Sequence, residues 1–496
     1  MGTVEPFRTV SNTWPASRWR LVPYLLPLAL LFILYAPVLR GWFREDDFAW
    51  LYMRQWMPEG SGWFYRLFSP QAQGTIRPGD RLFFTLLGGA FGRNPIPFHV
   101  VILATQCASI VLWMKVATRL TGSAWTGALA AVLWVSNAAL ADPMVWISGY
   151  NQVLLALFLL LAFLFKLKHL ETGEGRYRAL EWAAFLLGFG ALEMNVIYPL
   201  LGAAYLAAYR RTGWKNVAAQ AVVAALYTAL HTVAAPMPNT GAYASAVDAR
   251  MFLTFTRYWN LSLGPAEFAR WFPAFEAWVP AASALLLLAV LFALVVGIRR
   301  REPAMAFGAA WFVIGLAPVL ILPDHVSSYY LFMPVMGLAL AGAYAALMFQ
   351  SIWAKSAAIA LLVIHAATNA SAAVSIRDWT IDRTLRVRHF YDALDQIRAR
   401  GGPACILLTG MNDDEFWGGY YGIRRYVPDL QDLYLAPGSE RGITPIRDTF
   451  GTVADHAMPV TDARQRLAAG TCAAFDLRRT PPADVTPETL EKLRMQ

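Results

Sequence analysis

The stretch LVPYLLPLALLFILYAPV, residues 21–38, is followed after five residues by Arg44-Glu45-Asp46-Asp47-Phe48. The first stretch is apolar and nearly as long as a bilayer-crossing helix, which needs about 20 residues. It is longer than a signal-peptide core and no convincing cleavage site follows, so we expect a retained first span. Two adjacent carboxylates at the foot of a span are costly to desolvate, which indicates a partner or a chemical task for Asp46 and Asp47.

The composition indicates a polytopic membrane protein. The chain is 57% hydrophobic and 15% charged, with a mean hydropathy of +0.41, whereas soluble domains carry about 25% charged residues. The formal net charge of +9 comes from basic residues between apolar segments. Membrane topology and lipid headgroups explain such a pattern better than nucleic acid does. Three cysteines are too few for a disulfide scaffold.

Apolar windows of membrane-spanning length recur along the chain. We therefore expect an α-helical polytopic membrane protein with about eleven transmembrane helices. They are expected near residues 21–40, 97–118, 125–141, 151–167, 179–193, 195–210, 216–235, 278–298, 305–322, 329–348 and 356–374.

Lysine and arginine indicate the orientation of these spans. The short loops 142–150, 193–195 and 323–328 contain neither residue, and the opposite boundaries are basic. Because basic short loops stay in the cytoplasm, we expect a cytoplasmic N-terminus and, with an odd number of spans, an external C-terminus. The basic boundary residues are Arg8, Arg18, Arg20, Lys115, Arg119, Lys166, Lys168, Arg176, Arg178, Arg210, Arg211, Lys215, Arg299, Arg300, Arg301 and Lys355.

The expected topology divides the chain into a transmembrane domain, residues 1–375, and an external C-terminal domain, residues 376–496. Residues 41–96 and 236–277 become long external loops. Within the first, Phe48, Leu51, Tyr52 and Trp56 fall near one helical face. This spacing predicts an interfacial helix with Asp46 or Asp47 at its N-terminus and its aromatic side chains toward lipid.

The tail has the pattern of a small α/β domain. A charged helical pattern over residues 376–400 places Phe390, Leu394 and Ile397 on one face, and Gly401-Gly402-Pro403 ends it. Residues 404–408 are then expected to form a strand. Cys405 and Cys472 would lie in an oxidising compartment, either as a disulfide or as two buried thiols.

Four stretches, in order along residues 20–210, resemble the GT-C superfamily of membrane glycosyltransferases, most closely its TMTC-like and protein-mannosyltransferase-like bacterial branch. The acidic pair of 44–48 resembles the start of that family's first external loop. The other three stretches are Ile76-Arg77-Pro78 followed by FGRNPIPFH at 91–99, ADPMVWISG at 141–149, and LEMNVIYP at 192–199.

The resemblance implies an inverting transfer of a sugar from a polyprenyl-phosphate donor to an acceptor hydroxyl at the periplasmic face of a bacterial inner membrane. An aspartate acts as general base, with Asp46 favoured and Asp47 either orienting it or binding the acceptor. Arg77, with Arg81 second, would hold the phosphate. The other expected substrate-binding residues are Trp146, Glu193, His325 and Tyr329. The acceptor would be a protein, a lipid or a glycan.

No metal-binding motif occurs in the sequence, and we expect no required cofactor. Asp46 and Asp47 could supply two oxygens to a divalent cation, which some members of the superfamily use.

Other interpretations of these residues remain open. One acid of the pair could simply cap the interfacial helix, and Arg77 could pair with Asp80 or bind lipid headgroups. Asp413-Asp414-Glu415 has the pattern of a solvated acidic turn. The alternative functions are a secondary transporter or lipid-carrier flippase, and a non-catalytic envelope polysaccharide assembly protein. A transporter would place ionisable residues near mid-bilayer, where the spans hold almost no acids.

Overall fold

The computed structural model describes residues 22–57, 60, 62–70, 75–238, 240–427, 430, 432–445 and 452–495. Arg8, Arg18 and Arg20 lie outside this part of the chain, as does the side chain of Trp56.

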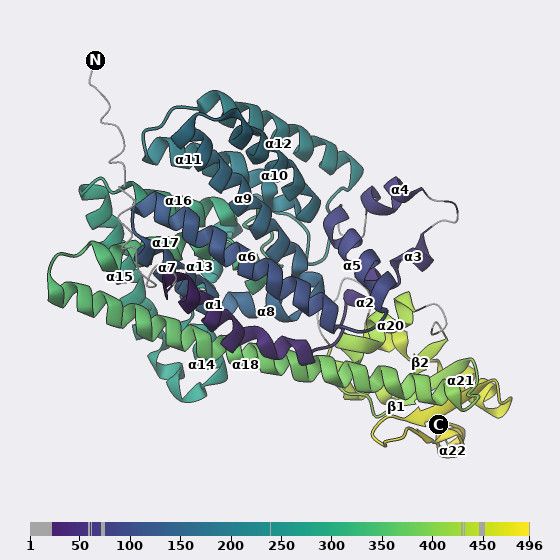
Figure 1. The fold of residues 1–496 in the computed structure, drawn as a ribbon. Helices are drawn as coiled ribbons and strands as arrows, with labels where there is room; N and C mark the ends of the chain where they lie inside the picture. Colours follow the sequence, from purple (N-terminus) through teal and green to yellow (C-terminus); the bar gives the residue numbers. More distant parts are fainter. Residues whose placement is uncertain are drawn as a thin grey trace.

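Each of the eleven expected spans coincides with a helix (Figure 1). They are α1 (Val22–Tyr35, continued by η2, Ala36–Arg40), α6 (Ile96–Thr121), α7 (Ala124–Ser136), α9 (Tyr150–Thr172), α10 (Gly175–Ala191), α11 (Tyr198–Ala208), α12 (Trp214–Ala234), α15 (Val279–Arg299), α16 (Pro303–Leu316), α17 (Pro334–Met348) and α18 (Ile352–Ala399).

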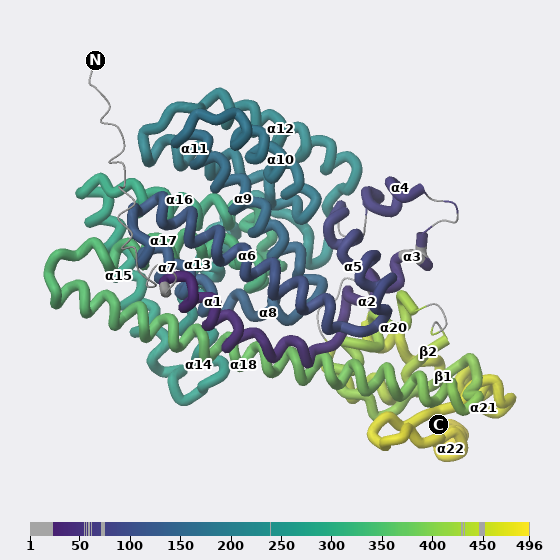
Figure 2. Tube along the Cα trace, in the orientation of Figure 1, coloured from purple at the N-terminus to yellow at the C-terminus, as the bar shows by residue number. Residues whose placement is uncertain are grey.

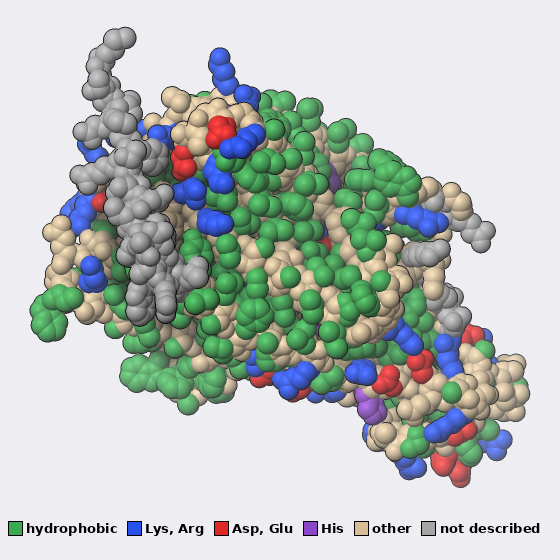
Figure 3. All heavy atoms as spheres, viewed as in Figure 1, with side chains coloured by type: hydrophobic (Ala, Val, Ile, Leu, Met, Phe, Trp, Pro, Cys, Tyr) green, Lys and Arg blue, Asp and Glu red, His purple; other side chains and the backbone are tan. Residues whose placement is uncertain are grey.

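Within the described residues, six helices are long and apolar enough to cross a membrane, or seven if α7 and the bent segment after it form one span. The helices α16 and α17 are apolar but shorter. The membrane-protein class therefore agrees with the sequence, and the count of eleven spans stays a prediction. Figure 3 shows hydrophobic side chains over most of the bundle, with charged ones gathered at the upper left and over the C-terminal part.

Close helix contacts hold the bundle together where the sequence supplies small residues. The helices α16 and α17 cross at Gly308 and Gly337, where each glycine faces the other's backbone. The indole of Trp134 on α7 donates to the carbonyl of Phe332 (2.8 Å), and Trp311 on α16 donates to that of Met333 (3.0 Å). A buried indole needs such a partner, so these bonds also fix how the helices are turned.

The first long loop forms short helices at the end of the bundle that also carries the C-terminal part (Figure 1). In the first loop these are α2 (Asp47–Leu51), α3 (Met53–Trp56), α4 (Trp63–Phe68) and α5 (Pro78–Phe91). The later loops contain η4 (Ala138–Leu140), α8 (Ala141–Val145), η5 (Ile147–Gly149), η6 (Glu193–Ile197), α13 (Arg250–Leu263), α14 (Pro265–Trp271), η7 (Pro273–Trp278), η8 (Ala317–Val319) and η9 (Ser328–Leu331).

The prediction that the aromatic side chains of residues 48–56 point toward lipid is wrong. The chain breaks at Tyr52 into α2 and α3, and Phe48 is buried against the rings of Trp42 and Tyr391. The aromatic face meets α18 of this chain rather than lipid, because a residue more than 300 positions away supplies its partner. Sequence periodicity identifies such a face but not what covers it.

The tail is confirmed as a small α/β unit. Figure 2 traces α18 without a break from the bundle into it, so the expected boundary at 375/376 falls inside a helix of 48 residues. Phe390, Leu394 and Ile397 are buried as expected, and α18 ends at Ala399, just before Gly401. The remaining helices are α19 (Asp413–Glu415), η10 (Phe416–Tyr420), α20 (Tyr421–Tyr426), η12 (Ser439–Gly442), η13 (Val453–His456), α21 (Val460–Ala468) and α22 (Thr486–Arg494).

The sheet of the tail has the order β2-β1-β3-β4. Its strands are β1 (Cys405–Thr409), β2 (Leu433–Leu435), β3 (Cys472–Asp476) and β4 (Ala483–Asp484). The strand β1 is parallel to both of its neighbours, and β4 is antiparallel to β3. Cys405 and Cys472 face each other across β1 and β3 and form a disulfide.

The α16–α17 crossing gives a stability prediction. A Cβ atom at Gly337 would meet the Gly308 carbonyl and lie 2.7 Å from the amide nitrogen of Phe312. Backbone on both sides cannot yield as a flexible side chain can, so Gly337→Ala should lower the free energy of unfolding by about 1–3 kcal/mol. The matched control is Gly342→Ala on the same helix, whose nearest neighbour would be 3.6 Å away. Thermal unfolding in detergent should separate the two; equal midpoints would contradict this packing.

Candidate active site

The loops that lack lysine and arginine meet the first long loop at one end of the bundle. Arg44 donates to Asp142 (2.8 Å), and Asn151 donates to Asp80 (3.2 Å). Arg77 pairs with Glu193 (3.6 Å). The ring of Trp146 lies 6.2 Å from that of Tyr329. The residues that the sequence predicted on one face of the membrane are therefore brought together, with the exceptions described below.

Asp47 is a buried carboxylate whose two oxygens both accept hydrogen bonds. The Ser148 amide donates to Oδ1 (2.8 Å), as does the Ser148 hydroxyl, and the Arg44 amide donates to Oδ2 (2.9 Å). Burial raises the pKa of Asp47 to about 7, and these hydrogen bonds oppose the rise. Asp47 thus ties the 44–51 turn to η5 across a separation of 101 residues.

Asp46 has the opposite environment. It occupies the N-cap position of α2 but makes no side-chain cap hydrogen bond, so the capping interpretation fails for this carboxylate. Its side chain is exposed and has no hydrogen-bond or ion-pair partner among the described residues. Even so, desolvation and then the charge of Glu45 raise its pKa to about 6, against the opposing charges of Arg77 and Arg44. The exposure shows that water reaches the Asp46 carboxylate, and the raised pKa reflects the protein atoms around it.

Arg44 is buried and lies between two carboxylates. It donates to Glu45 (3.0 Å) and to Asp142 (2.8 Å), and its guanidinium lies 5.0 Å from the centre of the Trp146 ring. Glu45 is in turn 3.4 Å from Arg383 of α18. The two carboxylates compensate the buried positive charge of Arg44. Its guanidinium therefore already has ion-pair partners within the protein.

Arg77 is the cation of the site that retains free donors. Its Nε lies 3.6 Å from Glu193, too far for a hydrogen bond, and it donates none to a described residue. Nearby carboxylates and tyrosines, Glu193 first, raise the pKa of Arg77 against the effect of burial, so it stays charged. Glu193 also accepts from the Ile76 amide (3.1 Å) and lies 3.7 Å from His231. Asp80 interacts electrostatically with Arg77, but no ion pair forms between them in the described part of the chain.

Asp80 is fully buried, and its Oδ1 has no hydrogen-bond partner among the described residues. Burial raises the pKa of Asp80 to about 7, while Arg77 and the Asn151 amide oppose the rise.

Aromatic side chains line the same end. His325 bonds the Tyr329 hydroxyl (2.7 Å), and its ring lies tilted against that of Tyr243 at 4.1 Å between ring centres. The ring centres of Tyr329 and Tyr330 are 4.4 Å apart. Tyr243 interacts electrostatically with both Asp46 and Arg77, which places it near the acid. Rings of this kind offer apolar faces with polar rims, as recognition of a sugar ring requires.

Arg81 does not join this group. Its guanidinium donates to the Arg66 carbonyl (2.5 Å), the Ser69 hydroxyl (2.7 Å) and the Ser69 carbonyl (2.5 Å). It fastens α4 to α5, and desolvation lowers its pKa. Arg77 and Arg81 are one helical turn apart, but Arg77 precedes α5 in non-helical backbone, so the two side chains do not share a direction.

Several residues of the site were not predicted from the sequence. Ser148 lies in a stretch that was singled out, but its role depends on a contact with Asp47. His231 lies near the end of the expected span 216–235 and Tyr243 follows that span, and neither carries a local signal. Asp414 is not a solvated turn residue: it pairs with Arg383 (3.1 Å) and Arg386 (2.6 Å).

No group of three or more His, Cys, Asp or Glu that could hold a metal ion occurs in the described part of the chain. Asp47 has fewer oxygen lone pairs to offer an ion than an unbonded carboxylate has, because both of its oxygens already accept hydrogen bonds.

Comparisons with known proteins give distant likenesses. No protein-family model matches the chain, and no curated protein sequence is significantly similar to it. The chain is similar to the crystal structure of ArnT from Cupriavidus metallidurans bound to undecaprenyl phosphate, at 14% identity and a TM-score of 0.45 over 93% of each chain. It is also similar to the cryo-EM structure of the arabinofuranosyltransferase AftD from mycobacteria, at 16% identity and a TM-score of 0.48.

The AftD likeness covers 96% of this chain and 36% of AftD. Since both TM-scores are below 0.5, the chemistry of the site is derived from this chain's own residues.

The contrast between the two aspartates gives a stability prediction. In Asp47→Asn, whichever way the amide turns, its NH₂ group faces the backbone N–H of Ser148 or of Arg44. One buried donor then loses its acceptor, which should cost about 1–3 kcal/mol of unfolding free energy. Asp46→Asn, at an exposed side chain, should stay within about 0.5 kcal/mol of the parent. Thermal unfolding at a pH above 7 measures both; an equal loss for the two variants would contradict the assignment.

Proposed function

We propose that the protein is an inner-membrane glycosyltransferase of the GT-C type, which transfers a sugar from a polyprenyl-phosphate donor to an acceptor hydroxyl at the periplasmic face. One observation carries the proposal. Asp46, an exposed carboxylate with no described partner, lies within electrostatic reach of Arg77, a cation with free donors. A carboxylate without a partner, beside a guanidinium that still has donors to offer, is the pair of groups that this transfer uses.

In the proposed reaction, Asp46 removes the proton of the acceptor hydroxyl as its oxygen attacks the anomeric carbon. The bond from that carbon to the phosphate oxygen breaks, and polyprenyl phosphate leaves with both bonding electrons. Attack opposite the leaving group inverts the anomeric configuration. Positioned general-base help is worth roughly 10²–10⁴-fold in rate, and a fixed cation stabilises the charge that develops on the leaving oxygen.

The other residues have supporting roles in this proposal. Asp47 anchors the turn that presents Asp46, through Ser148 and the Arg44 amide. Glu193 holds Arg77 in place without occupying its donors. Trp146, His325, Tyr329 and Tyr243 provide the aromatic surface for the sugar. The proposed steps use the side chains of this chain and pass through no metal.

The transporter alternative has one feature in its favour. Lys166 of α9 and Glu181 of α10 form a buried ion pair (2.7 Å) inside the bundle. Glu181 also accepts hydrogen bonds from Tyr198 (3.0 Å) and Gln220 (2.7 Å). Lys166 is about 24 Å along α9 from Tyr150, at a rise of about 1.5 Å per residue. The pair is satisfied and remote from the acidic pair, which suits a structural role.

The decisive experiment uses purified full-length protein in nanodiscs with undecaprenyl-phosphate monosaccharides, labelled in the sugar, and candidate acceptors. A transferase releases undecaprenyl phosphate, whereas a flippase only relocates the intact donor. Asp46→Asn should reduce release by about 10²–10⁴-fold. Full release by this variant would remove Asp46 as the base.

The pH profile provides a second measurement on the same assay. A base must be ionised, and a carboxyl with a pKa of about 6 is ionised to about 9% at pH 5 and about 91% at pH 7. Turnover should therefore rise with pH through about 6. A profile that stays flat from pH 5 to pH 7 would contradict a base with this pKa.

Arg77 is tested by binding rather than by turnover. Arg77→Gln should weaken the binding of undecaprenyl phosphate to the protein, because the fixed positive charge that pairs with the phosphate is lost. Arg81→Gln is the matched control: Arg81 is bonded to the Arg66 and Ser69 segment, so phosphate affinity should stay near that of the parent. Equal losses in both variants would point to a general effect of charge on the lipid.

A further inference from the structure

Glu45 is the point at which the acidic turn meets the C-terminal part of the chain. Its carboxylate lies between Arg44 (3.0 Å) and Arg383 (3.4 Å). Its backbone N–H donates to the carbonyl of Gly418 in η10 (2.7 Å). Glu45 also has a φ of +50°, an uncommon conformation for a residue with a side chain. A strained residue of this kind persists where its surroundings hold it.

The helix α20 packs directly onto the same turn. A Cβ atom at Gly422 would lie 2.7 Å from the Glu45 carbonyl oxygen and 3.1 Å from Phe48 Cδ2. Only glycine fits at this contact. The backbone of the tail thus touches the backbone of the residue just before Asp46.

Charge and aromatic contacts extend this interface. Asp414 of α19 pairs with Arg383 (3.1 Å) and Arg386 (2.6 Å), so the arginine that holds Glu45 is itself held by the tail. On α18, the Tyr391 ring stacks on Phe48, and its hydroxyl bonds that of Tyr52 (3.0 Å). The tail therefore contacts Glu45, just before the acidic pair, and Phe48 and Tyr52, just after it.

We propose that Glu45 is a positioning residue, through which the C-terminal α/β unit fixes the orientation and the protonation of Asp46. The proposal rests on the proposed function for its consequence in catalysis. In this proposal, contacts from the tail set the orientation of the Asp46 side chain and the pH at which it ionises.

The charged and titratable groups around Asp46 come from four segments. Arg44 and Glu45 belong to its own turn, Arg77 to the start of α5, Tyr243 to the loop before α13, and Tyr426 to α20. Of these, Glu45 is the one whose negative charge opposes ionisation of Asp46 and which the tail holds directly. Removing that charge should lower the pKa of Asp46.

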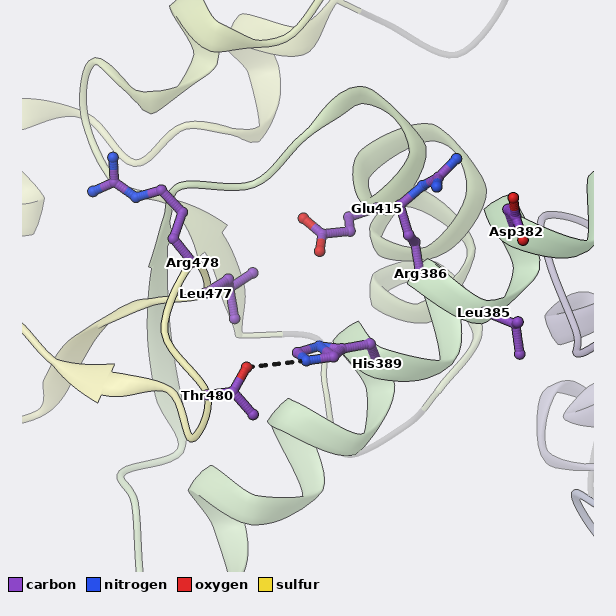
Figure 4. Close-up of a pocket in the computed structure, with 8 residues that line it drawn as sticks. All are labelled: Asp382, Leu385, Arg386, His389, Glu415, Leu477, Arg478 and Thr480. Atoms are coloured by element: carbon purple, nitrogen blue, oxygen red, sulfur yellow. Dashed lines mark hydrogen bonds between the residues drawn. The ribbon is translucent and has the colours of Figure 1, made fainter. Parts of the chain in front are cut away.

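The first test measures the geometry without any substrate. Hydrogen–deuterium exchange of residues 41–52 is followed in full-length protein for Arg383→Gln, Arg383→Lys and Arg478→Gln. Figure 4 shows Arg478 across a pocket of about 420 Å³ from Arg386, and Arg478 pairs only with Asp476 in the described structure. It is thus a matched arginine of the tail outside the Glu45 network.

Arg383→Gln should speed exchange at the Glu45 amide about tenfold or more, since the N–H to Gly418 bond opens more often. Arg383→Lys keeps the charge and should restore most of the protection, and Arg478→Gln should match the parent. Unchanged exchange in Arg383→Gln, or equal changes in both glutamine variants, would overturn the proposal.

The second test measures protonation. The infrared band of protonated carboxyl groups is titrated in the parent, and the component lost in Asp46→Asn is assigned to Asp46. In Glu45→Gln the midpoint of this component should move to lower pH. An unmoved midpoint would overturn the role of Glu45, whatever the turnover assay gives. Conversely, a shift in a protein that releases no undecaprenyl phosphate from any donor would leave the coupling intact and reject the proposed function.

Discussion

The hydrogen bonds that Asp47 accepts from Ser148 and from the Arg44 backbone are the constraint on which the site depends. They attach the first long loop to the connection between α8 and α9, about 100 residues further along the chain. These bonds fix the orientation of the turn, in which the Asp47 side chain is buried and the Asp46 side chain is exposed. Adjacent residues on a helix point about 100° apart, which is why one acid can be an anchor while its neighbour stays free.

Charges around this anchor alternate in sign. Along the contacts, Asp142 meets Arg44, Arg44 meets Glu45, Glu45 meets Arg383, and Arg383 meets Asp414. Each buried member has an opposite neighbour, which offsets the cost of removing it from water. Asp46 and Arg77 are near one another but outside this chain of pairs, which is why the proposed function assigns their further contacts to a substrate.

Much of the fold could be predicted from sequence, because span length and loop charge are local properties. Apolar windows located the eleven helices that coincide with expected spans, and the absence of lysine and arginine grouped the loops that meet at the site. Pairing between distant residues was not predictable. The periodicity of Phe48 and Tyr52 identified a helical face but not its partner Tyr391. The four-residue spacing of Arg77 and Arg81 gave no sign that α5 begins between them.

The helix-cap explanation of the acidic pair can be judged by the same geometry. A capping carboxylate bonds the exposed N–H groups of its own first helical turn, and Asp46, at the N-cap position, makes no such bond. Asp47 bonds backward to the Arg44 amide and across to Ser148 instead. A short helix such as α2 has little need of a second acid for its own stability. The pair is therefore better explained by the division it creates: a buried acid that holds the turn, next to an acid with an exposed side chain.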